Sequence, residues 1–133
     1  MSDQLIAHAV GDYLLQSDWM ANEKTKSNVA AAAHAATYTL PFLALRPSVK
    51  QVALIAGTHY LIDRYRLARY VCWGKNFIAP EGQDHELTAT GYPADRPVWM
   101  SVWLLIIADN TMHAVINRLV LGGINGSTQR HAN

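Results

Sequence analysis

The sequence predicts an all-α fold, a four-helix bundle with one long loop between the third and fourth helices. The first observation is that three His/Asp pairs lie four residues apart in apolar stretches, His8/Asp12, His59/Asp63 and, in reverse order, Asp109/His113. A helix turns once in 3.6 residues, so such pairs share a face. The second observation is that glycine, proline and acidic residues gather in one segment, roughly residues 74–96.

The first two helices are separated by a polar, basic segment. We expect the first at about residues 3–19, where apolar positions follow helical spacing. Ser27 or Asn28 can cap the second, which we place at about 28–45. Pro41 should bend this helix or end its regular part.

The third and fourth helices enclose the long loop. Ser48 and Gln51 occupy the two positions of a capping box, which predicts a helix at about 48–72. The loop at 74–96 is typical of a lid or binding loop, because simple connections are shorter. The fourth helix is expected at about 96–121.

Length and composition limit the class of protein. We expect residues 1–124 to form one helical, metal-binding domain and residues 125–133 a disordered tail. The net charge is +1, so no nucleic-acid groove is expected. The single cysteine, Cys72, excludes an internal disulfide and a cysteine-based zinc finger, and it favours a reducing, cytoplasmic location.

A small integral membrane protein is the alternative that the composition raises, since half of the residues are hydrophobic. Val29–Leu45 is 17 residues without a formal charge, and Pro97–Ala108 is 12. Both are short beside the roughly 20 residues of a spanning helix. Aspartates at 12, 63 and 109 would be costly at bilayer depth. We therefore expect a soluble protein with no membrane partner. Its apolar and aromatic residues favour a homodimer.

Seven side chains from all four predicted helices are candidate metal ligands: His8, Asp12, His34, His59, Asp63, Asp109 and His113. A buried ionised carboxylate is costly unless it is paired or bound to a metal. Imidazole and carboxylate suit zinc, manganese or iron. Seven ligands exceed the four of a structural zinc site, so they predict two divalent ions, or one ion with supporting partners. The three aspartates, Asp12, Asp63 and Asp109, are the candidate catalytic residues.

Polar and basic residues near these ligands are candidates for holding a small phosphorylated substrate: Gln16, Lys24, Lys26, Arg64, Arg66 and Asn117. Gln16 continues the face of Asp12 by one turn, and Asn117 continues that of His113. Arginine binds phosphate oxygens bidentately and lysine binds them as a point charge. Ordinary solvated charges and polar helix ends are the alternative explanation for each.

Several short motifs together resemble an uncharacterised family of small helical proteins from phages and bacteria. They are His8-x-x-x-Asp12-Tyr13-x-x-Gln16 with Trp19-Met20, His34 with Tyr38, His59-x-x-x-Asp63, Thr90-Gly91-Tyr92-Pro93 and Asp109-Asn110-x-x-His113. The resemblance covers about residues 5–118. It implies that the turn at 90–93 belongs to the functional surface, and it implies no particular activity. In chemistry alone, the chain is loosely similar to HD-type metal-dependent phosphohydrolases, although it lacks their adjacent His-Asp dipeptide.

The leading hypothesis is a metal-dependent hydrolase of a phosphoester or phosphoanhydride, such as a nucleotide or cyclic nucleotide, that could be phage-encoded. The metal would activate a water and polarise the phosphoryl group. Arg64 or Lys24 would neutralise the remaining charge. The alternative is a non-enzymatic binding or sequestering module, in which a metal or an all-protein His–Asp network is structural.

Overall fold

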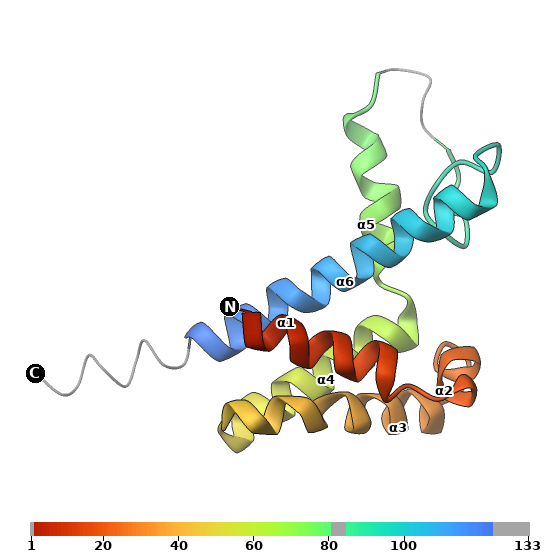
Figure 1. Ribbon diagram of the computed structural model, residues 1–133. Coiled ribbons are helices and arrows are strands. Elements are labelled where there is room, and N and C mark those ends of the chain that lie inside the picture. The colour runs from red at the N-terminus through yellow and green to blue at the C-terminus, as the bar shows by residue number, and fades with distance from the viewer. Residues whose placement is uncertain (1, 81–84, 124–133) are drawn as a thin grey trace, which may run out of the picture. The chain divides into compact units, whose positions relative to one another are not determined.

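The computed structural model describes residues 2–80 and 85–123, and within these it is all-helical, as predicted. The α-helices are α1 (Ser2–Ala9), α2 (Asp18–Glu23), α3 (Asn28–Thr39), α4 (Val49–Tyr65), α5 (Ala68–Gly74) and α6 (Val98–Gly123) (Figure 1). Three short segments join them, the π-helix η1 (Val10–Leu14) and the 3-10 helices η2 (Leu40–Leu45) and η3 (Lys75–Ile78). The described residues thus hold six α-helices where four were predicted. The predicted tail at 125–133 lies outside them.

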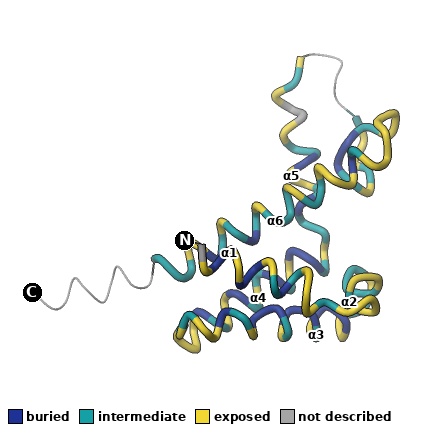
Figure 2. The backbone as a smooth tube through the Cα atoms, viewed as in Figure 1, coloured by how far each residue is buried: buried dark blue, intermediate teal, exposed yellow. Residues whose placement is uncertain are grey.

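The chain divides into two compact units. Unit 1 is Met1–Tyr65 with His113–Asn133, and unit 2 is Arg66–Met112, so α6 contributes to both. In unit 1, α3 packs against α4, α1 contacts η2, and η1 contacts both α3 and η2. The buried residues of this unit lie where these helices meet (Figure 2). Tyr38, Phe42 and Ile55, all fully buried, form the centre of its apolar core.

The predicted first helix is wrong at its C-terminal end, because the chain does not continue as one helix to residue 19. After α1 it widens into the π-helical turn η1, and Ser17 then begins the separate helix α2 by accepting a hydrogen bond from Met20 N at 3.3 Å. Serine caps a helix in this way because its side chain satisfies a free backbone N–H. A π-turn inside a helix is often found at a functional site, and this one carries Asp12.

The predicted start of the second helix is confirmed, whereas the α-helix ends at Thr39, before the predicted end at residue 45. Ser27 accepts a hydrogen bond from Ala30 N at 3.3 Å and caps α3. The helix tightens into η2 around Pro41, whose nitrogen has no hydrogen to donate. Arg46, with φ at 53°, then ends η2 in the left-handed conformation.

The predicted third helix begins as expected but is broken in the middle. The capping box is present, with Ser48 N donating to Gln51 Oε1 at 2.8 Å and Gln51 N donating to Ser48 Oγ at 3.3 Å. However, α4 ends at Tyr65, because Arg66 has a left-handed φ of 51° and α5 begins only at Ala68. A left-handed residue ends the regular backbone hydrogen bonding of a helix.

In unit 2, the turn at residues 88–92 is held by its own hydrogen bonds. Thr88 Oγ1 accepts from Gly91 N at 3.0 Å and donates to Tyr92 O at 2.7 Å. Gly91 has a φ of +76°, and a Cβ there would lie 2.1 Å from the carbonyl oxygen of Arg69. Both the conformation and the close approach therefore require glycine.

We expect Gly91→Ala to destabilise the protein by more than about 1 kcal/mol, since alanine can neither adopt this backbone conformation nor fit beside Arg69. Gly74→Ala is the matched control, because a Cβ on that helical residue meets nothing within 4 Å. Thermal unfolding followed by circular dichroism measures both. A melting temperature unchanged by Gly91→Ala would contradict this account of the turn.

Candidate metal centre

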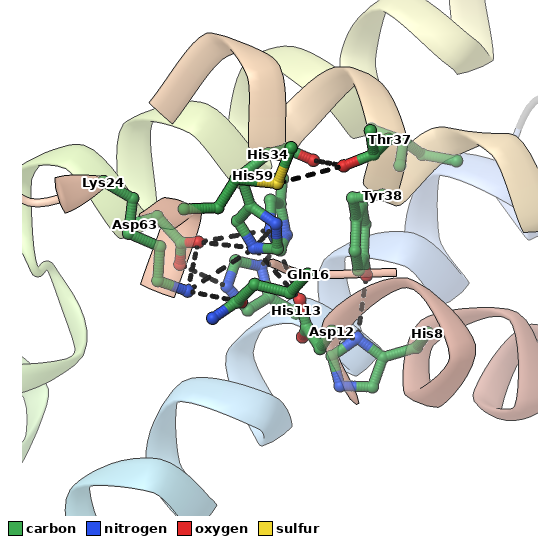
Figure 3. A network of polar contacts seen from close by, with 12 residues as sticks. His8, Asp12, Gln16, Lys24, His34, Thr37, Tyr38, His59, Asp63 and His113 are labelled. Atoms are coloured by element: carbon green, nitrogen blue, oxygen red, sulfur yellow. Dashed lines mark hydrogen bonds and ion pairs between the residues drawn. The ribbon is translucent and has the colours of Figure 1, made fainter. Parts of the chain in front are cut away.

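Five of the predicted ligands meet in unit 1, and we call them the His/Asp cluster: Asp12, His34, His59, Asp63 and His113 (Figure 3). They come from η1, α3, α4 and α6, with His59 and Asp63 one turn apart on α4. All three imidazoles and Asp63 are buried, and the side chain of Asp12 is 10% exposed. The sequence spacing placed each residue on a helix face, and the packing of the helices brings these faces together.

Two carboxylate oxygens each have the spacing of metal ligands relative to the same pair of imidazole nitrogens. His34 Nε2 and His59 Nε2 are 3.0 Å apart. Asp12 Oδ1 lies 3.4 Å from the first nitrogen and 3.5 Å from the second, and Asp63 Oδ2 lies 3.1 and 3.3 Å from them. Ligands held tetrahedrally at about 2.0–2.1 Å from zinc are about 3.3–3.4 Å from one another, and neighbouring octahedral ligands are about 3 Å apart. The donor set and its spacing therefore fit a divalent ion.

His113 completes a second group of three candidate ligands with His59 and Asp63. Its Nδ1 lies 3.2 Å from His59 Nδ1, and its Nε2 lies 3.3 Å from Asp63 Oδ1. His59 thus presents one ring nitrogen to each group. The arrangement can accommodate a second ion, or His113 can orient Asp63 as a partner outside the ligands of a single ion.

The Asp12 carboxylate is left incompletely satisfied by the protein. Its Oδ1 is buried and accepts no hydrogen bond within the described part of the chain. Burial raises the pKa of this carboxyl, but the imidazoles of His34, His59 and His8 outweigh burial and hold the pKa below its usual value. Asp12 is therefore ionised at neutral pH, and a buried anionic oxygen whose nearest imidazole nitrogens lie 3.4 and 3.5 Å away is the kind of atom that a cation would satisfy.

Lys24 brings a positive charge to the edge of the cluster. Its Nζ lies 2.8 Å from Asp63 Oδ2, 3.4 Å from His34 Nε2 and 3.2 Å from Gln16 Oε1. The side chain is 19% exposed, so solvent reaches it, in contrast to the imidazoles. The structure thus places both Lys24 and Gln16 beside the cluster. Their role in binding a substrate stays a prediction.

Three residues outside the cluster, His8, Tyr38 and Asn117, contact its members or one another. His8 Nδ1 lies 3.3 Å from Asp12 Oδ2 and 2.8 Å from the Tyr38 hydroxyl, to which Asn117 Nδ2 donates at 2.6 Å. The Tyr38 ring stacks on His59, with the centroids 3.6 Å apart and the planes at 13°. His8 and Asn117, predicted as ligand and substrate residue, here contact Tyr38.

Tyr38, paired with His34 among the motifs of the family resemblance, is a site residue that was not predicted as one. The available signal was its position four residues after His34, on the same face of α3. Gly11 is a second such residue. A Cβ on Gly11 would lie 2.6 Å from Tyr38 Cδ2 and 2.9 Å from Tyr38 O, so glycine lets η1 approach the tyrosine.

Two of the predicted substrate residues make other contacts in unit 1. Lys26 pairs with Glu23 at 3.4 Å on the surface. Arg64 donates to Asn28 Oδ1 and to Thr25 O, both at 2.7 Å, and so joins α4 to the start of α3. These contacts give both residues a structural role that needs no substrate.

The remaining predicted site residues belong to unit 2. Asp109 lies one turn before His113 on α6 and is half-buried. Arg66 donates to Ala89 O at 3.1 Å. Asp109, Arg66 and the turn at 90–93 all lie in unit 2. Their predicted roles in metal and substrate binding stay predictions.

Comparisons with known proteins identify the family and no activity. No curated protein and no solved structure matches the chain significantly. The comparisons therefore show no likeness to HD-type phosphohydrolases. A family described as "Protein of unknown function (DUF3307)" matches residues 1–120. The match covers most of the sequence, and the chain therefore belongs to the DUF3307 family.

Proposed function

We propose that the protein is a metal-dependent hydrolase of a phosphoester or phosphoanhydride, with nucleotides and cyclic nucleotides as the first substrates to test. The observation that carries this proposal is the spacing of His34 Nε2, His59 Nε2, Asp12 Oδ1 and Asp63 Oδ2, five distances of 3.0–3.5 Å between donors of the type that zinc, manganese and iron take. The buried Asp12 Oδ1, which accepts no hydrogen bond among the described residues, supports it.

The surrounding residues have chemistry suited to phosphoryl transfer. A bound divalent ion would supply Lewis acidity and lower the pKa of a water. His8, 3.3 Å from Asp12 Oδ2, orients that carboxylate, and the Tyr38 ring fixes the plane of His59. Lys24 is the cation nearest the cluster with exposure to solvent, so it is suited to hold a phosphoryl oxygen.

A structural His–Asp network in a non-enzymatic module is the second candidate. The observation that favours it is the short Lys24–Asp63 ion pair, 2.8 Å, since the protein itself already places a cation on Asp63. In such a network the charges balance through hydrogen bonds and the cluster needs no metal.

Metal binding distinguishes the two candidates. We expect purified protein to contain zinc, manganese or iron by mass spectrometry. After chelation, restoring the ion should raise the melting temperature, because an ion at 100 times its Kd adds about 2.7 kcal/mol to the free energy of unfolding. Hydrolysis of nucleotides and of a nitrophenyl phosphodiester should be lost with the metal and recovered with it. Protein without metal, and unaffected by added metal, would favour the network.

A further inference from the structure

Unit 1 buries many polar residues beside its apolar core and exposes many large aliphatic side chains. Its buried polar and charged residues are Gln4, His8, His34, Thr39, Gln51, His59, Asp63, His113 and Asn117. Its large exposed aliphatic residues are Leu5, Ile6, Leu14, Leu15, Val29, Leu40, Leu43, Val49, Leu54, Leu61, Val115 and Leu119. A water-soluble bundle shows the opposite distribution, with aliphatic stripes inside and polar faces outside.

Half of the buried apolar residues of unit 1 are alanines, and the other half are Tyr38, Phe42, Ile55 and Ile62. Ala30, Ala31 and Ala35 are the buried apolar residues of the first three turns of α3, while Val29, beside them in sequence, is 70% exposed. Ala7 plays the same part in α1. Helices in lipid associate through small residues, because lipid tails are as apolar as leucine and burying leucine gains nothing there.

Helix α6 has the length and composition of a membrane span. Val98–Gly122 has a mean hydropathy of 1.3, and only 11% of its most apolar stretch is buried. Its 25 residues extend about 38 Å, more than the roughly 30 Å of bilayer hydrocarbon. The residues that α6 buries are polar, namely Ser101, His113 and Asn117, whereas Trp99, Trp103 and Ile107 are exposed. The core helix of a soluble protein would bury the apolar side.

Charged residues of unit 1 gather at the two ends of the α3–α4 pair. Val29–Leu45 carries no charge, nor does the stretch at 51–62 in α4. At one end, Arg64 binds Thr25 and Asn28 at the start of α3. At the other, Arg46 and Arg118 line a common pocket beside Gln51. An uncharged belt between two charged ends matches a bilayer between its two polar interfaces.

From these observations we infer that the protein is embedded in a lipid bilayer, with α6, the one described helix long and apolar enough, crossing it and the exposed apolar side chains in contact with acyl chains. The exposed aliphatic residues lie on α1, η1, α3, η2, α4 and α6, so they are not confined to one helix. A bilayer covers such a surface on all sides, whereas a second copy covers one face. Asp12 and Asp63 are compatible with this, because they face the interior and contact imidazoles and Lys24, as charges in membrane proteins do. The inference does not depend on the proposed metal.

Flotation tests this inference on the full chain. After expression in bacteria and a carbonate wash, we expect the protein to float with membranes in a sucrose gradient and to enter solution only with detergent. Aggregates would sink, so flotation separates insertion from insolubility. A monodisperse protein obtained without detergent would overturn the inference, and if that species is a dimer, a second copy covers the apolar surface.

Two further measurements locate the contact on α6. Trp19→Phe with Trp73→Phe leaves Trp99 and Trp103 as the only tryptophans. In phosphatidylcholine vesicles, we expect lipids brominated on the acyl chains to quench their fluorescence at least twofold and aqueous acrylamide to quench it little. Efficient quenching by acrylamide alone would overturn the inference.

A charged substitution on α6 gives a second check with a matched control. Ile107→Arg should reduce the floating fraction several-fold, because an arginine near the middle of a span opposes insertion. Ala94→Arg, exposed and outside the helix, should leave it unchanged. Equal flotation of the two variants would count against the inference, and the fluorescence result stands even if Ile107→Arg does not fold.

Discussion

Asp63→Asn is expected to remove metal binding and to lower hydrolytic turnover by about a thousandfold or more, since a metal contributes several kcal/mol of transition-state stabilisation. Asp63 contacts four residues of the site through its two carboxylate oxygens. Its Oδ2 lies near His34, His59 and Lys24, and its Oδ1 lies 3.3 Å from His113 Nε2. Asparagine keeps the shape and one acceptor but loses the negative charge.

The stability of Asp63→Asn separates the two proposed functions. If the aspartate serves as a metal ligand, the variant should stay folded by circular dichroism and lose only metal and activity. If the cluster is a structural network, the variant should unfold, because Lys24 and the imidazoles lose their shared anion. Asp18→Asn is the matched control, since that exposed carboxylate contacts only Asn22 among the hydrogen bonds described. Metal content equal to wild type in Asp63→Asn would contradict the assignment of the ligand.

Gly11→Ala is expected to destabilise the protein by about 1–3 kcal/mol, the usual cost of inserting a methyl group into a packed interior. The methyl would lie 2.9 Å from the Tyr38 carbonyl oxygen, a backbone atom that cannot rotate away. Either η1 or Tyr38 must shift, and both shifts displace Asp12 or the ring stacked on His59. Metal affinity should therefore fall together with the melting temperature.

Gly57→Ala in α4 is the control for this substitution, because a Cβ there meets nothing within 4 Å. It should stabilise the helix by about 0.5–1 kcal/mol, since alanine loses less conformational entropy than glycine. Unfolding curves and metal titrations of the two variants provide the comparison. If both variants melted above the wild type, the close packing of η1 on Tyr38 would be wrong.

The helical class and the grouping of His59 with Asp63 follow from local rules that a sequence displays. The four-residue spacing sets a helix face, and the capping box marks the start of α4. The breaks at Ser17 and Arg66 were missed. Arg66 adopts a left-handed conformation, which arginine does not favour, so the residue type does not predict the helix end at this position.

The spacing also does not predict which side of each helix is buried. Alternation of polar and apolar sides shows that a helix has two faces, but the solvent decides which face turns inward. In unit 1 the structure buries His34, His59 and Asn117 and exposes Leu61 and Leu119. Contacts between distant segments, such as Tyr38 with Asn117, depend on that choice and appear only in three dimensions.

An anomalous-difference map from crystals of the purified protein tests the metal centre most directly. At the absorption edge of the bound element, the account predicts a peak about 2 Å from His34 Nε2 and His59 Nε2, with Asp12 Oδ1 and Asp63 Oδ2 as the expected carboxylate ligands. A second peak beside His113 would indicate two ions. A map without any peak at these atoms, from crystals grown with zinc or manganese, would contradict it.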